Sequence, residues 1–501
     1  MINMFTLKKY NSCFALLFFF VTFLADAQIG IGTTTPNASS VLDVTSTTQG
    51  MLTPRMTTVQ RNAIATPADG LIVYDTDLKG FYYYSTGTST WIALVNSGTG
   101  RLNFKRIRST DNLAVVLAAE LAAGGGAKYV LNSNTLYEIN GMIDLNFPID
   151  LNNAYIQGLD PNEDMISRAN GNIFEGANGG GIRSVTLRAI GGSVFNLNGA
   201  ATQNLIFRDS IVFGSNSVGT ISGFGLVFLS IIQYAGNSNG ITYNNITQLL
   251  LSNCGWFSTN LGTYEKFTGN FTLIEKQGGF SQVDGSAIGF DVSTPNLVIN
   301  GDAVMESVVF TGSNTAGYVK GYTSNSYPGY NFSNSWNVRS AGIPTETDAN
   351  AVGDFAMDYN GGAGLPVTFN TNNSNPSEAV KIGSQTNPAP VTIYSNLFRF
   401  YTDSPNRLRY AGKKKRIFQI TGSISFQVNG AGTFIIFLYK NGQPLSQYKI
   451  YGRGQVSGDI VVLPINATTE LVTNDYIEVF VQRYSGNTTS IFVPNMVVII
   501  K

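Results

Sequence analysis

The sequence predicts an all-β protein, in which a right-handed parallel β-helix is followed by a C-terminal antiparallel jelly roll, with a small β-rich module at the N-terminus. Two observations predict this fold. Short apolar segments rich in β-forming residues recur every 20 to 24 residues between about 185 and 299, which is the period of one β-helix coil. From about residue 396, apolar and polar residues alternate, as they do in antiparallel strands with one buried face.

The composition limits the chemistry that the protein can perform. The 501 residues include 31 basic and 31 acidic side chains, 54 glycines, no histidine and two cysteines. A chain without a basic excess lacks the positive field that phosphate binding requires, so we exclude nucleic acid as a partner. The absence of histidine excludes Ser-His-Asp triads, Cys-His dyads and imidazole metal sites. We therefore expect no metal and no cofactor.

Residues 1–27 have the layout of a signal peptide for secretion. Lys8 and Lys9 precede an apolar run at 14–24, and the small residues around Ala27 suit cleavage. A retained membrane anchor is the alternative, but the run is shorter than the roughly 20 residues that cross a bilayer. We expect a secreted or cell-surface protein with no transmembrane segment after cleavage. Only one cysteine then remains, so stability must come from a large core or from oligomerisation.

Residues 28–96 are predicted to form an N-terminal attachment module. Thr57 and Gln60 have the spacing of a capping box at the start of a short helix. The segment 75–80 is interpreted as a hairpin turn between two strands. It begins like a calcium loop, but Lys79 stands where a further oxygen ligand would be needed.

Three motifs in this module indicate a family context. They are Gly-Ile-Gly-Thr-Thr-Thr-Pro at 30–36, Leu-Asp-Val at 42–44 and Pro-Arg-Met-Thr-Thr at 54–58. The segment resembles a module that recurs at the N-terminus of exported Bacteroidota proteins and in some fibre proteins of their phages. The resemblance covers this module alone, and it implies a bacterial surface or fibre context without implying a reaction.

Residues 101–310 are predicted to form the β-helix. The first strand of each coil is expected at 185–187, 205–207, 226–228, 249–251, 273–275 and 297–299. Further apolar patches follow these segments, with Gly, Asn and Ser between them, which suits three strands per coil. Consecutive coils stack and build one continuous core. A β-sandwich with irregular strand spacing is the alternative, but sandwiches lack this longer second period.

A helix is expected at 111–123, with Thr110 or Asp111 as its cap and the glycines at 124–126 as its end. It would cover the exposed strand edge of the first coil. The periodicity of the whole region resembles that of the pectin-lyase-like right-handed β-helix superfamily, although no specific motif of that superfamily is present.

Residues 311–395 lose the period and become rich in Gly, Asn, Ser and Pro, so we interpret them as a connector. Residues 396–501 are predicted to form the jelly roll, and Asn441-Gly442 between two of its strands is a strong hairpin signal. The order of a Gly-x-Ile-x-Phe strand, a Leu-Tyr-Lys-Asn-Gly hairpin and an Asn-Asp-Tyr-Ile strand resembles the trimeric jelly rolls of the tumour-necrosis-factor and complement-like group. That resemblance implies a homotrimer.

Residues that could catalyse a reaction are few and scattered. β-helix enzymes that cleave acidic polysaccharides carry Asn-Thr-Asp, Gly-His-Gly or Arg-x-Pro-x-x-Arg motifs, which are absent. The densest acidic group is Asp160, Glu163 and Asp164, which could hold calcium or act as an acid and base, although a solvated turn is favoured. The other charges are spread over the coils: Arg208 with Asp209, Glu265 with Lys266, Glu275 with Lys276, and Asp302 with Glu306. The second and third of these groups are too close in sequence to stack on successive coils, so a general base there is only an alternative.

Carbohydrate binding is better supported than catalysis. Sugars bind to aromatic faces flanked by amides and hydroxyls, and six aromatic residues lie between Tyr318 and Trp336 among Asn, Ser and Gly. From these and from the basic group that opens the last domain, we predict the following binding residues: Tyr322, Tyr327, Tyr330, Trp336, Arg407 and Arg409. The alternatives are that the rings pack a small irregular subdomain and that the basic group, from Arg399 to Arg416, is a solvated connection.

The sequence thus predicts a secreted or cell-surface, fibre-like adhesin that forms a homotrimer, binds a polysaccharide or glycan surface and has no catalytic residues. Three weak sites on one rigid trimer would bind far more tightly than one site. The alternative is a tailspike-like polysaccharide depolymerase, a lyase or glycoside hydrolase, whose carboxylates would meet in a groove on the β-helix or between subunits.

Overall fold

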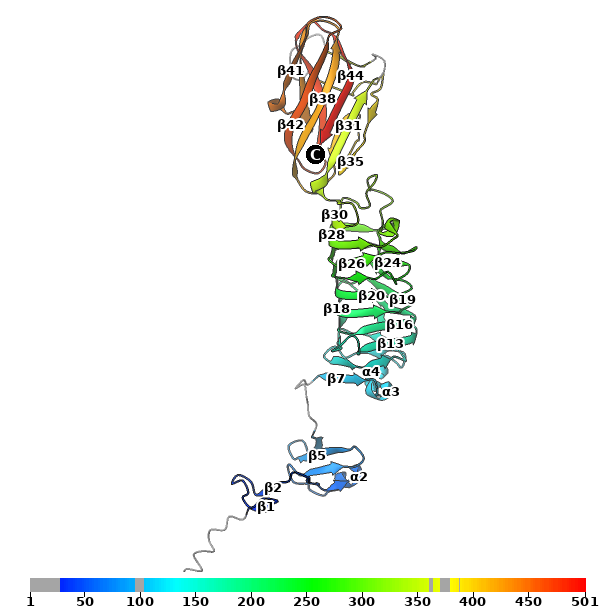
Figure 1. Ribbon diagram of the computed structural model, residues 1–501, viewed down its shortest axis with the longest axis vertical. Coiled ribbons are helices and arrows are strands. Elements are labelled where there is room, and N and C mark those ends of the chain that lie inside the picture. Colours follow the sequence, from blue (N-terminus) through cyan, green and yellow to red (C-terminus); the bar gives the residue numbers. More distant parts are fainter. Residues whose placement is uncertain (1–27, 95–102, 360–363, 370–378, 387) are drawn as a thin grey trace, which may run out of the picture. The chain divides into compact units, whose positions relative to one another are not determined.

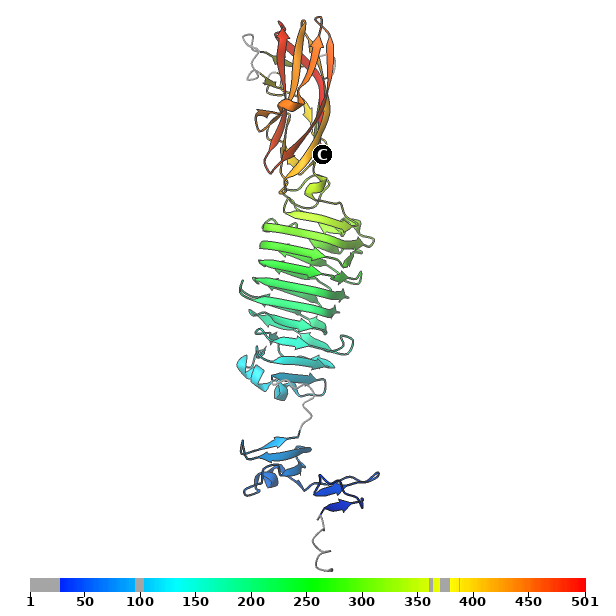
Figure 2. The same ribbon diagram turned by 90° about the vertical axis from the view of Figure 1, so that its left-hand side faces the viewer.

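The computed structural model describes residues 28–94, 103–359, 364–369, 379–386 and 388–501 (Figures 1 and 2). Contacts divide the chain into two compact units, one ending at Leu102 and the other beginning at Asn103. The predicted signal peptide, residues 1–27, lies outside the described residues. Within the described ranges, no helix is long and apolar enough to cross a membrane.

The first unit contains two small sheets and a short helix. Its elements are β1 (Ile29–Ile31), β2 (Leu42–Val44), β3 (Arg55–Met56), α2 (Thr58–Asn62), β4 (Ile72–Asp75), β5 (Gly80–Ser85) and β6 (Thr90–Ala93). The predicted capping box is confirmed, because the Thr57 side chain accepts from the Gln60 backbone and the Gln60 side chain accepts from the Thr57 backbone. The predicted hairpin at 75–80 is also confirmed, because β4 and β5 pair in antiparallel fashion around it.

The second unit begins with a parallel β-helix (Figure 2). Its strands form a 15-stranded sheet, which bends into two faces that we call sheet 1 and sheet 2, and a 9-stranded sheet that we call sheet 3. Sheet 1 contains β7 (Phe104–Arg108), β9 (Leu136–Asn140), β12 (Tyr155–Gln157), β15 (Gly180–Arg183), the first halves of β18 (Asn204–Phe213) and β20 (Leu226–Ala235), β22 (Gln248–Ser252), β25 (Asn270–Gln277) and the first half of β28 (Val298–Thr311). Sheet 2 contains β10 (Met142–Asp144), β13 (Met165–Asn170), β16 (Thr186–Gly191), the second halves of β18, β20 and β28, β23 (Gly255–Trp256) and β26 (Phe280–Gln282).

Sheet 3 closes each coil. It contains β8 (Tyr129–Val130), β11 (Ile149–Asp150), β14 (Phe174–Gly176), β17 (Ser193–Asn198), β19 (Ser217–Ser222), β21 (Ile241–Asn244), β24 (Thr263–Thr268), β27 (Ile288–Asp291) and β29 (Val319–Lys320). All of its pairings are parallel, as they are in the other two sheets of the β-helix.

The pairing register confirms the predicted repeat, within one residue, for the segments at 205–207, 226–228, 249–251 and 273–275. The segment at 185–187 lies instead in sheet 2, and 273–275 pairs with 302–304 and not with 297–299. Phe207 pairs with Leu229, and Leu229 pairs with Leu251, so the same inward position recurs from coil to coil. Large rings stack in the interior, for example Trp256 between Tyr234 and Tyr264, with ring centroids 3.9 and 5.1 Å away. Because no coil buries its apolar face alone, these columns are what hold the β-helix together.

The bend between sheet 1 and sheet 2 requires a left-handed backbone conformation in successive coils. The residues at this bend have positive φ angles: Ser184 (54°), Asp209 (53°), Ile231 (55°), Asn253 (51°), Gly278 (64°) and Ser307 (59°). The residues just before the bend pair in register from Arg208 to Ser230 and Ser252, so the bends stack as a column.

The helix predicted at 111–123 is corrected in two respects, its continuity and its cap. The segment forms two short helices, α3 (Leu113–Val116) and α4 (Ala118–Ala123), and the cap of α3 is Asn112 instead of Thr110 or Asp111. The Asn112 side chain accepts from the Ala114 backbone, and Leu117 leaves the helical conformation. This break lets Leu113 and Leu117 both join the apolar core at the first coil, so the pair of helices covers the coil as predicted (Figure 1).

The predicted connector at 311–395 is wrong in both of its boundaries. Strand β29 and strand β30 (Trp336–Ala341) still belong to the β-helix, because β29 pairs with β27 and β30 pairs with β28. Strand β31 (Val352–Asp358) already belongs to the C-terminal domain, because it pairs with β44 (Ser490–Ile500). The loss of the sequence period therefore reflects long loops around the last coil, and the domain boundary lies between 341 and 352.

The C-terminal domain is an antiparallel sandwich of two sheets, which confirms the predicted fold class. One sheet contains β31, β32 (Leu365–Thr368), β34 (Thr392–Ile393), β35 (Leu397–Phe398), β38 (Arg416–Val428), β42 (Ile460–Leu471) and β44. The other contains β33 (Val380–Lys381), β36 (Phe400–Tyr401), β37 (Arg407–Tyr410), β39 (Gly432–Lys440), β40 (Gln443–Pro444), β41 (Ile450–Gly454) and β43 (Tyr476–Gly486). Asn441 and Gly442 form the predicted hairpin turn, with φ angles of 52° and 76°.

Candidate ligand-binding pocket

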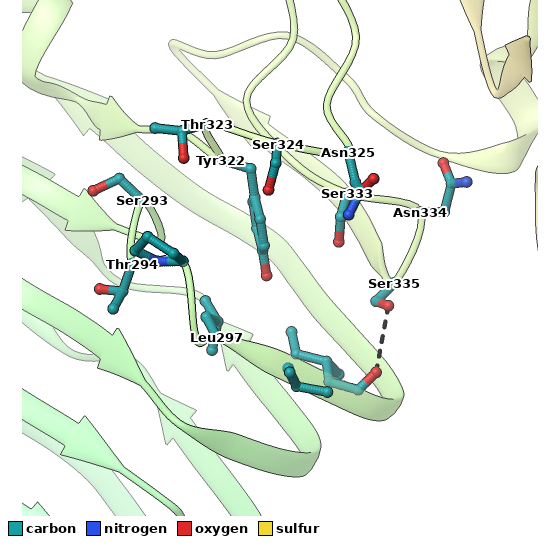
Figure 3. A pocket seen from close by; sticks show the side chains of 13 residues that line it. Ser293, Thr294, Leu297, Tyr322, Thr323, Ser324, Asn325, Ser333, Asn334 and Ser335 are labelled. Atoms are coloured by element: carbon teal, nitrogen blue, oxygen red, sulfur yellow. Dashed lines mark hydrogen bonds between the residues drawn. The ribbon is translucent and has the colours of Figure 1, made fainter.

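A pocket of about 440 Å³ lies beside the last coils of the β-helix (Figure 3). Two loops form it: the loop between β27 and β28, and the loop between β29 and β30, which contributes both of its ends. The side chains that line it include one phenol and many hydroxyls: Ser293, Thr294, Pro295, Leu297, Val298, Ile299, Tyr322, Thr323, Ser324, Asn325, Ser333, Asn334 and Ser335. Its volume is within the range of pockets that bind small molecules.

Local hydrogen bonds hold the two loops in place. The Leu297 backbone donates to the Thr294 carbonyl at 3.0 Å, and the Tyr322 backbone donates to the Asn331 carbonyl at 2.8 Å. The Ser335 hydroxyl donates to the Ile299 carbonyl at 3.5 Å, as Figure 3 marks. The pocket is therefore built on the rigid end of the β-helix.

Tyr322 is the principal polar group of the pocket, and its ring extends toward Leu297 (Figure 3). Its hydroxyl oxygen accepts from the Trp336 indole nitrogen at 3.0 Å. Burial raises the pKa of Tyr322, so the phenol stays protonated at neutral pH. Because accepting one bond does not use its own hydrogen, the hydroxyl can still donate to a ligand.

The pocket contains no carboxylate, amine or guanidinium among its lining side chains. Proton transfer to or from a substrate is carried out by positioned titratable side chains, and Tyr322 is the one such side chain in this lining. The lining can donate to and accept from a neutral, hydroxyl-rich molecule.

Trp336, which the sequence predicted as a binding residue, is corrected by its burial. Its side chain is 0% exposed and belongs to the interior cluster of the β-helix. It packs against Phe290 and Phe332, with ring centroids 5.6 and 5.0 Å away. It cannot present its face to a sugar, and it contributes to the pocket only through its hydrogen bond to Tyr322.

Tyr327 and Tyr330 lie outside the pocket lining and pack on Phe398 of the C-terminal domain. Their ring centroids are 5.4 and 4.1 Å from that of Phe398. The Tyr327 hydroxyl donates to the Asn334 side chain at 2.8 Å, and burial raises its pKa. Both rings are half-buried, so each keeps only part of its surface for a ligand.

Arg407 and Arg409 lie on β37, apart from the pocket lining, and both are ion-paired. Arg407 Nε is 2.8 Å from Glu478 Oε1, and Arg409 Nη2 is 2.7 Å from Asp403 Oδ2. Both guanidinium groups also lie over the ring of Tyr476, at 4.2 and 4.6 Å from its centroid. Their charge is largely neutralised by these carboxylates.

Arg399, the first member of the predicted basic group, serves a structural purpose. Its side chain is fully buried, and it donates to the Trp336 carbonyl at 2.6 Å and to the Asn334 side chain at 2.9 Å. It thus joins the C-terminal domain to the loop before β30. The interpretation of this residue as part of a solvated connection, or as a polysaccharide contact, is wrong.

The acidic group at 160–164 forms a turn, as the favoured interpretation predicts, but Asp164 is buried and not solvated. The Asp164 carboxylate accepts from the backbones of Gly141, Leu159 and Asp160, at 2.8, 2.6 and 3.0 Å. Burial opposes its ionisation, but these backbone donors outweigh it and hold the pKa of Asp164 below its usual value. In the part of the chain that the structure describes, no cluster of three or more acidic or cysteine side chains is arranged to hold a metal ion.

The structure also joins two charges that the sequence placed apart. Lys276 Nζ lies 2.8 Å from Glu265 Oε2, and both side chains are buried inside the β-helix. Strand alternation could have revealed one half of this pair, because Lys276 follows Ile274 at the next inward position of β25. The loop residues of the pocket carry no such periodic signal, which is why only Tyr322 of its lining was predicted.

The fold and the pocket define a modular all-β protein with a parallel β-helix and a pocket whose lining is uncharged. Residues 30–109 match a family described as "Phage tail like trimerisation region". No curated protein matches the sequence.

Solved structures give only weak similarities. The tailspike protein 4 enzymatically active domain of bacteriophage CBA120 is 10% identical, with a TM-score of 0.23, over 90% of this chain and 77% of that chain. Tailspike protein gp49 from Acinetobacter baumannii bacteriophage Fri1, described as a capsular polysaccharide depolymerase, is 8% identical, with a TM-score of 0.24, over 89% and 98%. Murine APRIL is 10% identical, with a TM-score of 0.19, over 30% and 98%. Scores this low carry no argument about function.

Proposed function

We propose that the protein is a fibre-like adhesin, secreted or held at a bacterial cell surface, that binds a glycan without cleaving it. The observation that carries this proposal is the chemistry of the pocket. Sugars present many neutral hydroxyl groups, and the pocket supplies hydroxyls, amides and the Tyr322 phenol, with no carboxylate, amine or guanidinium among the lining side chains. Affinity would come from several directed hydrogen bonds together with contact between the sugar and the Tyr322 ring.

The proposed assembly is a homotrimer. The match of residues 30–109 to a trimerisation region supports it. Three pockets on one assembly would convert weak single-site binding into tight attachment, because the second and third contacts form at a high effective concentration. Tyr327, Tyr330, Arg407 and Arg409 remain proposed as further contacts of a longer glycan chain.

A glycan array tests the proposal. The mature chain, from Gln28 onward, is expected to bind at least one glycan on the array. Replacing Ser324, an exposed residue of the lining, as Ser324→Trp fills the pocket and is expected to abolish that binding. Thr220→Trp places the same bulk on the exposed face of β19 and is the matched control, which should bind as the wild type does. Equal binding by both variants would overturn the pocket as the glycan site.

The second candidate function is a polysaccharide depolymerase, and three carboxylates favour it. Glu275 on β25 pairs with Val304 on β28, and Asp302 and Glu306 lie on either side of Val304 along that strand. Two such carboxylates at a suitable separation are what glycoside hydrolysis requires. Turnover of a panel of acidic and neutral polysaccharides, measured as reducing ends or unsaturated products and lost in Glu306→Gln, would end the adhesin proposal.

A further inference from the structure

A group of apolar side chains lies on the outside of the β-helix on both sides of the bend between sheet 1 and sheet 2, with polar residues such as Arg208, Ser230 and Gln233 interspersed. We call this group the apolar corner. It consists of Ile206, Phe228 and Leu250 on sheet 1, Phe213 and Phe257 on sheet 2, and Ile231 at the bend itself. Ile231, Phe213 and Phe257 are 52%, 46% and 36% exposed, and the other three side chains are half-buried.

The pairing register makes the sheet 1 part of the corner continuous. Ile206 pairs with Phe228, and Phe228 pairs with Leu250, so their side chains stack on the outer face in three successive coils. The same column starts lower in the β-helix, where Phe104 pairs with Leu136 and Leu136 pairs with Tyr155. Residue 104 falls within the stretch that matches the trimerisation region.

Ile231 differs from the residues at the other bends, because its side chain disfavours the left-handed backbone conformation that it adopts. The left-handed conformation crowds a side chain that branches at Cβ, and it suits Gly, Asn and Asp. The stacked bends carry Ser184, Asp209, Asn253, Gly278 and Ser307 in the same conformation. Only Ile231 among these is both branched and apolar, and it is also exposed. Within a single chain, no burial offsets this strain.

The outer face of sheet 3 is polar, in contrast to the apolar corner. One register column along it contains only polar or charged residues: Asp150, Glu175, Asn196, Thr220, Thr242, Lys266, Asp291 and Lys320. The β-helix therefore has one face suited to water and two other faces with apolar outer residues, which meet at a bend that is polar apart from Ile231 and Gly278.

We propose that the apolar corner packs against two further copies of this chain, with Ile231 directed toward the three-fold axis. This inference rests on the trimer of the proposed function and adds which surface forms it. In a cyclic trimer each copy presents two different surfaces, one to each neighbour. The outer face of sheet 1 contacts the outer face of sheet 2 of the next copy, and sheet 3 faces the solvent. Burial of Ile231 between copies offsets the strain of its backbone.

Spin labels on the mature chain test this arrangement. The variants are Ile231→Cys at the corner and Thr220→Cys on sheet 3, each labelled with a nitroxide and compared by pulsed dipolar spectroscopy. Cys254 is buried, so the wild-type chain should take up no label and serves as the blank. Light scattering on the same samples gives the number of copies.

The expected result is a trimer with a shorter distance between labels at 231 than between labels at 220. A trimer with the reverse order, or with equal distances, overturns the apolar corner as the interface but leaves the trimer of the proposed function intact. A monomer overturns both. Circular dichroism of each variant reports whether the β-helix has folded.

A charge at the corner provides a second measurement. Phe228→Glu puts a carboxylate into the proposed interface, and Thr220→Glu puts the same charge on sheet 3. The protein concentration at which half of the trimers dissociate is expected to rise at least tenfold for Phe228→Glu only. Equal values for the two variants contradict the proposal.

Discussion

The Glu265–Lys276 pair and the pocket beside Tyr322 lie in nearby coils of the same β-helix, yet their polar groups are opposite in kind. The pair consists of two full charges that are 2.8 Å apart and buried among aromatic rings. The pocket is open to a ligand and is lined by neutral hydroxyls and amides. The lining of this pocket contains no full charge, whereas the closed interior at Glu265 and Lys276 contains two.

We therefore expect the buried pair to contribute to stability and the pocket to contribute to ligand binding. A buried ion pair is costly to break, because removing one partner leaves an uncompensated charge in a medium of low dielectric. A neutral pocket contributes little to stability, because its hydroxyls bond to water when no ligand is present. Substitutions in the two regions should therefore have different consequences, and the following predictions test that separation.

The largest effect is expected from breaking the buried pair. Lys276→Met should lower the free energy of unfolding by about 3 to 5 kcal/mol, because Glu265 is left buried without its partner. Chemical denaturation measures the change. Replacing both residues, as Glu265→Leu with Lys276→Met, should recover most of the loss. Lys266→Met, on the outward side of β24, is the control, and an equal loss in this control would contradict the prediction.

A smaller effect on stability is expected from Tyr322→Phe. This change removes the acceptor of the buried Trp336 indole nitrogen, which should cost about 1 to 3 kcal/mol. It also removes a donor to the ligand, so the affinity for the bound glycan should fall by about tenfold. Denaturation and glycan titration measure the two effects. Unchanged affinity would show that the phenol does not contact the ligand.

Ile231→Asn is expected to stabilise the isolated fold by about 1 kcal/mol. Asparagine occupies the equivalent bend at 253, and it tolerates the left-handed conformation that crowds a branched side chain. The same change should weaken the trimer, because it removes apolar surface from the corner. Thermal unfolding below the trimer dissociation concentration measures the first effect, and light scattering measures the second. Destabilisation of the monomer would contradict the assignment of strain.

The smallest effect concerns pH and the turn at 160–164. Because the pKa of Asp164 is held below its usual value, its ionised form adds stability above the ordinary aspartate pKa of 3.8. That stability is lost as the pH falls below 3.8 and through the lowered pKa of the folded state. Asp164→Asn should flatten the acid limb of a plot of stability against pH. An unchanged acid limb would assign the acid sensitivity to other carboxylates.

The sequence predicted the features that carry a periodic or strong local signal and missed those that depend on long loops or on strand pairing. The recurring apolar segments gave the β-helix, and the Asn441-Gly442 turn gave a hairpin of the sandwich, because each rests on a local or periodic signal. The end of the β-helix was placed too early, because long loops separate β29 from β30 and hide the last coil. Trp336 looked like a surface aromatic in a loop-rich segment, but strand pairing turns it inward.

The pocket could be predicted only in part for a related reason. Its lining comes from two loops and the start of β28, which are brought together by the last coils, and Ser, Thr and Asn are common in the loops of this chain. Tyr322 was identifiable because an aromatic residue is informative by itself. The pairing of Lys276 with Glu265 depends on the coil register, which a short spacing in sequence does not reveal.

Hydrogen exchange in the presence of a glycan tests directly whether the pocket beside Tyr322 binds a glycan without cleaving it. A glycan chosen from the array is added to the trimer at saturation, and backbone exchange is compared with that of the free protein. If the pocket binds the glycan, we expect slower exchange at 293–299 and 322–335, with the glycan recovered intact. Protection of β25 and β28 around Glu275 and Glu306, together with a cleaved glycan, would contradict it.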